Sequence, residues 1–102
     1  MLPVRRRPEA DDDLVRIFDY IAQFRTRSAE RFLQAAERAL QQLARFPRMG
    51  SLCESGNPTL AGLRMWRIRR FRKYVILYRE TDKDVDVLRV LHSARNLEML
   101  FK

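Results

Sequence analysis

Cysteine, glycine and histidine are scarce in this sequence of 102 residues, which contains one cysteine, three glycines and one histidine. Because Cys53 has no second cysteine, an internal disulfide is excluded, and no partner ligand stands at a spacing typical of metal sites. We therefore expect a reducing, cytoplasmic setting and no metal or other cofactor. The role of Cys53 itself stays open.

Long apolar runs are absent as well. The opening segment MLPVRRRPEADDD lacks the apolar stretch of about 7 to 15 residues that a signal peptide requires. Nothing in the chain approaches the ~20 apolar residues of a membrane-spanning helix. The longest uncharged apolar run, YVILY, is typical of a buried strand. We expect neither a targeting segment nor a membrane contact.

The composition is that of a globular protein, with 46% hydrophobic and 33% charged residues. A chain of about this length buries roughly 65% of the surface that it exposes when unfolded, which is enough for a core without disulfides. We expect one domain that spans residues 1–102.

Basic residues outnumber acidic ones, and the formal net charge is +8. The excess is uneven, because the segment from Leu63 to Arg79 contains seven basic residues and no acidic one. Such a balance predicts an acidic partner, either nucleic acid or an acidic protein segment. Charge alone does not distinguish between these two.

A strand and an amphipathic helix are predicted at the N-terminus. LPVRRR favours a strand over residues 2–7, and Pro8 suits the first turn of a helix that ends near Phe24 or Arg25. Apolar residues recur at i, i+3, i+4 and i+7 in this helix. They are Leu14, Ile17, Phe18 and Ile21.

Four acidic residues stand at the start of this helix: Glu9, Asp11, Asp12 and Asp13. Acidic side chains at this end complement the positive end of the helix dipole. A metal site is the alternative, and it is disfavoured because the acids are clustered rather than spaced for ligation and no histidine is near. We expect these residues to stabilise the helix start.

A second amphipathic helix follows, and Thr26 or Ser28 can cap its start. Pro47 and Gly50 end it. Its apolar stripe contains small residues that allow close approach of a neighbouring element: Ala29, Phe32, Leu33, Ala36, Leu40, Leu43 and Ala44. The two helices are predicted to form a helical hairpin.

After a loop over residues 47–62, the pattern becomes that of β-strands. β-branched and aromatic residues predict three antiparallel strands over residues 63–69, 73–80 and 84–92, with TDKD as a tight turn. Residues 93–101, SARNLEMLF, are expected to form a short helix or an ordered tail. The fold class is therefore α+β: an N-terminal strand, a helical hairpin on one face of the sheet, and a three-stranded antiparallel meander.

The segment RMWRIRRFRK interleaves six basic residues with Trp66 and Phe71. Guanidinium groups bind phosphate or carboxylate, and aromatic rings offer stacking surfaces. The alternative is a solvated sheet face on a basic protein, with the aromatic side chains packed inside. The strand arginines, including Arg79, and Trp66 must divide between the sheet edges and the open face. The candidate binding residues are Arg64, Trp66, Arg67, Arg69, Arg70 and Arg89.

The C-terminal segment holds His92, the one histidine, with Arg95 three residues later. Acid–base catalysis by a histidine needs a lysine, a tyrosine or a second base within reach, and no triad or pair of carboxylates is evident. A structural role at the end of the last strand is the alternative. Leu97 and Phe101 belong to an apolar tail that either docks on its own domain or anchors a partner.

The chain resembles the ParE branch of the ParE/RelE superfamily, the toxins of bacterial type II toxin–antitoxin systems. The segments EADDDLVRIFDYIA, SAERFLQAAERALQQLARFPRMG, LRMWRIRRFRKYVILYRE and VDVLRVLHSARN carry the resemblance, which covers nearly the whole chain. The histidine–x–x–arginine ending matches at His92 and Arg95. The C-terminal tyrosine frequent among RelE-like nucleases is missing, and Phe101 stands in that region.

The resemblance implies a toxin that a cognate ParD-like antitoxin neutralises with a wrapping tail, while the antitoxin's DNA-binding domain brings the complex to operator DNA. It favours DNA gyrase as the target, and a binding-type poison rather than an enzyme. Target or antitoxin would then be bound by the candidate residues named above together with His92, Arg95, Leu97 and Phe101.

Two alternatives stay open. The chain could be a RelE-like, ribosome-dependent mRNA endonuclease, with His92 as acid or base and Arg64 or Arg95 stabilising phosphate charge. It could also be a degenerate member that binds its antitoxin and poisons nothing.

Overall fold

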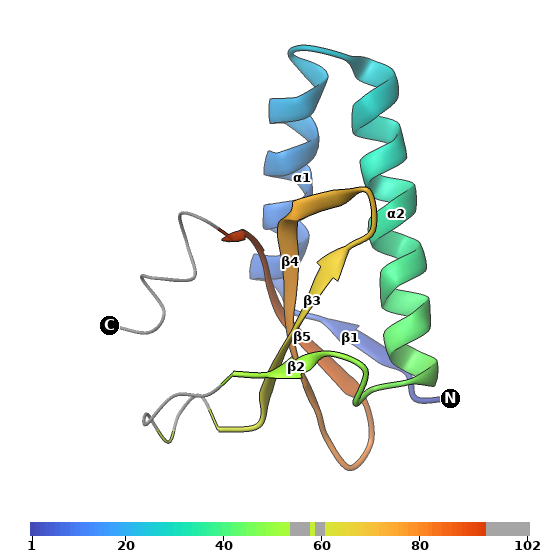
Figure 1. The fold of residues 1–102 in the computed structure, drawn as a ribbon, viewed down its shortest axis with the longest axis vertical. Helices are drawn as coiled ribbons and strands as arrows, with labels where there is room; N and C mark the ends of the chain where they lie inside the picture. Colours follow the sequence, from blue (N-terminus) through green and yellow to red (C-terminus); the bar gives the residue numbers. More distant parts are fainter. Residues whose placement is uncertain (54–57, 59–60, 94–102) are drawn as a thin grey trace.

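The computed structural model describes residues 1–53, 58 and 61–93, and the elements in this part of the chain follow the predicted order with one additional short strand, β2 (Figure 1). The elements are β1 (Val4–Arg6), α1 (Pro8–Ala22), α2 (Thr26–Arg45), β2 (Ser51–Leu52), β3 (Leu63–Ile68), β4 (Phe71–Glu80) and β5 (Val85–His92). The α+β fold class is confirmed. The predicted C-terminal helix or tail from residue 94 onwards, with Arg95, Leu97 and Phe101, lies outside the described residues.

The five strands form one sheet in the order β1-β5-β4-β3-β2. The meander of β3, β4 and β5 is antiparallel as predicted, whereas β1 runs parallel to β5, so that the sheet is mixed. The sequence analysis missed β2, which lies inside the predicted loop and pairs with β3 through two residues. Two residues are too few to produce a recognisable alternation of apolar and polar side chains.

The helices form the predicted hairpin and lie side by side along the sheet (Figure 1). Helix α1 contacts β5, and α2 contacts β1 and β3. Pro8 opens α1 as expected, but the predicted cap of α2 is wrong. Thr26 is already helical, and Arg25 occupies the capping position without a side-chain hydrogen bond. The Arg25 carbonyl instead accepts the backbone N–H of Ala29.

The main core lies between the helices and the sheet. Phe32 of α2 is fully buried and meets the rings of Phe71 and Tyr74 edge to face, at centroid distances of 5.5 and 5.3 Å. The predicted stripe of α2 is buried except for Leu33, which is 37% exposed, and Ala39 is buried in addition. The alanine-rich face of α2 therefore sets how closely it approaches the sheet.

Tyr78 of β4 is buried beneath the segment that follows α2. Its hydroxyl donates to the Pro47 carbonyl at 2.7 Å and accepts the Gly50 N–H at 2.8 Å. Burial raises the pKa of this phenol. A Cβ at Gly50 would lie 2.5 Å from the tyrosine oxygen and 2.8 Å from the Met65 carbonyl oxygen. This close approach explains why glycine follows the helix here.

The sheet face opposite the helices is apolar at its centre, which corrects the expectation of an open face lined by arginines and Trp66. Leu63, Val75, Leu77 and Leu91 form a second cluster there and are at most 3% exposed. Trp66 instead packs against the main core. Successive side chains of a strand point to opposite faces of the sheet. Since Leu63 faces the second cluster, Arg64 and Trp66 lie on the side of the helices.

Asp13 is buried by the fold, at 4% exposure. Its carboxylate accepts hydrogen bonds from Nε and Nη2 of Arg89 at 2.7 and 2.9 Å, and from the backbone N–H of Val90 at 3.0 Å. Strand β1 pairs with β5 only as far as Val87. The Asp13 side chain therefore replaces a strand neighbour beyond that point and ties α1 to β5. The prediction that the acid run serves the helix dipole is wrong for this residue, although Glu9 and Asp11 do occupy the first turn.

Asp86 is the second buried carboxylate, at 3% exposure. Arg7 donates to it from Nε and Nη2 at 3.1 and 2.9 Å, and Arg5 lies 3.3 Å away. The hydrogen bonds from Arg7 lower the pKa of Asp86 and raise the pKa of Arg7. This pair joins the start of α1 to the start of β5.

Candidate interaction surfaces

The end of the β3–β4 hairpin carries a basic and aromatic surface, which we call the hairpin surface. Arg69 and Arg70 form the exposed turn. Arg70 has a φ of 73°, a left-handed conformation that costs an arginine about 1–3 kcal/mol. Trp66 shares surface cavities with both arginines, one of which also contains Arg67 and Arg72. The hairpin surface comprises Trp66, Arg67, Arg69, Arg70 and Arg72.

The positive charges of the hairpin surface are not balanced by carboxylates among the described residues. Arg67 donates to the Arg72 carbonyl at 2.8 Å and to Oγ of Ser93 at 3.3 Å. Among the described residues, no carboxylate forms an ion pair with any of its four arginines. Tryptophan and arginine are the residues that most often dominate binding energy at interfaces. The structure therefore brings together four of the candidate residues, Trp66, Arg67, Arg69 and Arg70, at one exposed end of the sheet.

Two other candidate arginines are held by internal contacts. Arg64 donates from Nη1 to the Gly50 carbonyl at 2.7 Å and to the Arg48 carbonyl at 3.2 Å, which secures the segment after α2. Arg89 is bound to Asp13, and that hydrogen bond raises the pKa of its guanidinium. Both side chains have structural partners that the sequence analysis did not foresee.

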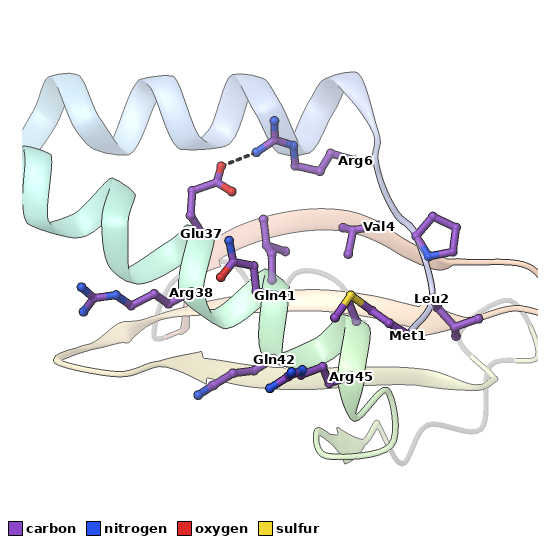
Figure 2. Close-up of a pocket in the computed structure, with 12 residues that line it drawn as sticks. Met1, Leu2, Val4, Arg6, Glu37, Arg38, Gln41, Gln42 and Arg45 are labelled. Atoms are coloured by element: carbon purple, nitrogen blue, oxygen red, sulfur yellow. Dashed lines mark hydrogen bonds and ion pairs between the residues drawn. The ribbon is translucent and has the colours of Figure 1, made fainter.

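A groove of about 900 Å³ lies between the N-terminal strand and α2 (Figure 2). Its floor is apolar, with Leu40 and Ala44 buried and Leu2 and Val4 half-buried. Polar and basic side chains line it from α2, and an ion pair of 2.7 Å between Arg6 and Glu37 closes one end. The further side chains labelled there are Arg38, Gln41, Gln42 and Arg45 (Figure 2).

Strand β1 is at the edge of the sheet, so in the described part of the chain one side of its backbone has no strand partner. Such an edge can accept an extended segment of another protein by strand addition. No feature of the sequence pointed to this groove, because it forms from segments about 40 residues apart.

His92 lies at the end of β5, opposite Tyr74 in the β4–β5 register. The two rings meet edge to face at 5.5 Å. The sequence analysis found no triad or pair of carboxylates for this histidine; the structure shows that Lys73, Tyr74 and Tyr20 line the same pocket. That pocket joins α1 to the ends of β4 and β5, and periodicity alone could not have placed these residues together.

Arg64 is remote from this pocket. It pairs with Tyr78 on β4, four residues along the strand from Tyr74. At a strand rise of about 3.3 Å per residue, the two positions are separated by about 13 Å along β4. The nuclease alternative assigned His92 as acid or base and Arg64 or Arg95 to the phosphate charge. Of these, His92 and Arg64 are described, and they do not lie in one site.

Cys53 is half-buried against the second cluster, and burial raises the pKa of its thiol. Across the described residues, no group of three or more histidine, cysteine, aspartate or glutamate side chains could hold a metal ion. Within the same part of the chain, neither helix has the length and apolar character needed to cross a membrane.

Comparisons with known proteins agree with this architecture. A sequence model of the family described as "ParE toxin of type II toxin-antitoxin system, parDE" matches residues 4–97. A chain of the solved structure "Chromosomal ParDE TA system from P. aeruginosa" is similar, with a TM-score of 0.72 and 22% identity over 90% of this chain and 96% of that one. No curated protein matches significantly.

The structural likeness establishes the fold, and the family match extends from β1 to beyond the end of β5. The chain therefore belongs to the ParE toxin family of type II toxin–antitoxin systems.

Proposed function

We propose that this toxin acts in the cytoplasm by binding and inhibiting DNA gyrase, and that a cognate antitoxin neutralises it. The observation that carries the binding mode is the hairpin surface, where four exposed or partly exposed arginine side chains and Trp66 gather without carboxylate partners among the described residues. A partner with acidic groups and an apolar pocket would complement it. The family resemblance supplies gyrase as the expected target.

The groove beside β1 is the expected site of the antitoxin tail. Its apolar floor suits large apolar side chains, and Arg38 and Arg45 at its rim suit acidic ones. The free edge of β1 would let an extended segment add its backbone to the sheet. An antitoxin of the ParD type would bring its own DNA-binding domain, so that contact with operator DNA would be made by the complex.

A second candidate function is ribosome-dependent cleavage of mRNA. The observation in its favour is that His92 shares a pocket with Lys73 and Tyr74, which are groups capable of proton transfer. Against it, Arg64 lies about 13 Å away along the sheet and is bound to two carbonyl groups.

The test compares both activities with the same purified toxin. Supercoiling by gyrase is measured beside translation-dependent mRNA cleavage, for the natural chain and for His92→Ala. Inhibition of gyrase without cleavage is the expected result. Cleavage that disappears in His92→Ala would establish the nuclease instead. If neither activity occurs and unneutralised expression leaves growth unchanged, the chain is a degenerate member that retains antitoxin binding.

A further inference from the structure

The pocket that contains His92, here called the His92 pocket, has a volume of about 450 Å³. This is within the range of about 300–1,000 Å³ found for small-molecule sites. Helix α1 contributes Arg16 and Tyr20 to it, and the strands contribute Lys73, Tyr74, Arg89 and His92. Hydrogen-bond donors therefore converge on it from both layers of the fold.

Two irregularities of the sheet aim side chains at this pocket. Lys73 and Tyr74 are consecutive in β4 and both line it, although a regular strand would point them to opposite faces. The β3–β4 register shifts in this part of the hairpin. The β4–β5 register also shifts, because Leu88 of β5 has no partner residue on β4. The next two residues, Arg89 and Val90, both line the pocket. Bulges of this kind re-aim side chains and are frequent next to functional sites.

The charge of the pocket is positive. Arg16, Lys73 and Arg89 contribute three positive charges and Asp13 one negative charge, which leaves +2 with His92 neutral. Asp13 does not present its charge to a ligand, because its oxygens accept from Arg89 and from the Val90 N–H. The Arg16 side chain is 72% exposed, and its one ion pair, with Asp13, is long at 3.9 Å, so most of its N–H groups are available to a ligand.

His92 supplies an unused polar atom at the wall. Its Nδ1 is shielded from solvent and has no hydrogen-bond partner among the described residues. The edge-to-face contact with Tyr74 holds the ring in place. A buried polar atom without a partner is unfavourable, and a turn of the imidazole toward the pocket would let a ligand oxygen accept from it and remove that cost.

We propose that the His92 pocket binds a phosphate group. Phosphate oxygens accept hydrogen bonds from ammonium, guanidinium, imidazole and phenol donors, which are the groups gathered here. Tyr20 and Phe24 form an edge-to-face pair beside the pocket, at 5.5 Å, and are 57% and 72% exposed. These rings would let a nucleotide base stack next to the bound phosphate. The source is therefore either free phosphate or a nucleotide, and the proposal does not depend on gyrase inhibition.

His92 makes the test direct, because as the one histidine it gives a single imidazole Cε1–H signal by NMR. The purified full-length chain is titrated at fixed pH and ionic strength with inorganic phosphate, with AMP and with adenosine. A saturable shift with phosphate and AMP is expected. Tighter binding of AMP assigns the nucleotide as source, and AMP that binds no more tightly than phosphate assigns the free anion.

Two variants remove exposed cations of the pocket without touching the core. Lys73→Gln and Arg16→Gln should each weaken phosphate binding about tenfold, since each removes one charge-assisted hydrogen bond. Lys83→Gln, an exposed lysine in the β4–β5 turn, is the matched control and should leave the affinity unchanged. The proposal is overturned by the lack of a saturable shift, by adenosine binding as tightly as AMP, or by equal affinities in all three variants.

Discussion

Replacement of Asp13 by alanine should destabilise this fold more than the same replacement of any other acidic residue at the start of α1. The carboxylate is buried and joins α1 to β5 through Arg89 and through the backbone of Val90. Alanine keeps the helix, so the loss reports on these contacts rather than on helix propensity.

The magnitude follows from two terms. An unpaired Val90 N–H costs about 1–3 kcal/mol when its acceptor is removed. Breaking a fully buried ion pair costs about 3–5 kcal/mol, but Arg89 is 38% exposed and water can solvate its guanidinium, which lowers that figure. We expect a total near 3 kcal/mol, to be compared with about 5–15 kcal/mol for the whole stability of a domain.

Urea unfolding followed by circular dichroism measures the change. Asp12→Ala is the matched control, because Asp12 is the exposed neighbour of the same type, and its free energy of unfolding should change by less than about 0.5 kcal/mol. In the double variant with Arg89→Met, the loss should be smaller than the sum of the two single losses. Equal effects of Asp13→Ala and Asp12→Ala would refute the role assigned to this carboxylate.

Three further predictions concern other buried groups. Because hydrogen bonds from Arg7 lower the pKa of Asp86, its stabilisation is present above the unfolded value of about 3.9 and is lost as the pH falls through the folded value. Urea unfolding below about pH 4 should therefore show a steeper loss of stability for the natural chain than for Asp86→Asn, and parallel curves would contradict this. Gly50→Ala should cost about 1–3 kcal/mol, because its Cβ would overlap Tyr78 and the Met65 carbonyl; an unchanged melting temperature would show that this approach is looser than described. Cys53, whose thiol pKa burial raises, should react with iodoacetamide more slowly in the folded than in the unfolded chain, and equal rates would contradict its burial.

Most of the fold could be predicted from the sequence because its longer elements have clear periods. The stripe of Leu14, Ile17 and Ile21, and the runs of β-branched residues around YVILY, specify helices and strands locally. The parallel pairing of β1 with β5 joins segments about 80 residues apart, and nothing local records it. Strand β2 is two residues long and leaves no pattern.

The interaction surfaces were harder to predict, because each depends on which face a side chain takes. Six basic residues in RMWRIRRFRK looked equivalent, yet Arg64 is bound to carbonyl groups while Arg69 and Arg70 form an exposed turn. Asp13 and Asp12 are adjacent and chemically identical, and only packing against β5 separates them. The His92 pocket depends on two register shifts in the sheet, which disturb the alternation on which strand predictions rely.

The most direct test of binding-type toxicity is the concentration of toxin that halves supercoiling by purified gyrase. Arg69→Gln/Arg70→Gln should raise this concentration by at least about tenfold, since two central interface arginines each contribute more than about 1 kcal/mol. The matched control is Arg25→Gln/Arg27→Gln, which removes the same charge from exposed positions at the turn of the helical hairpin, and it should act like the natural chain. Equal losses in both double variants, or a natural chain that cleaves mRNA and leaves gyrase active, would contradict the account.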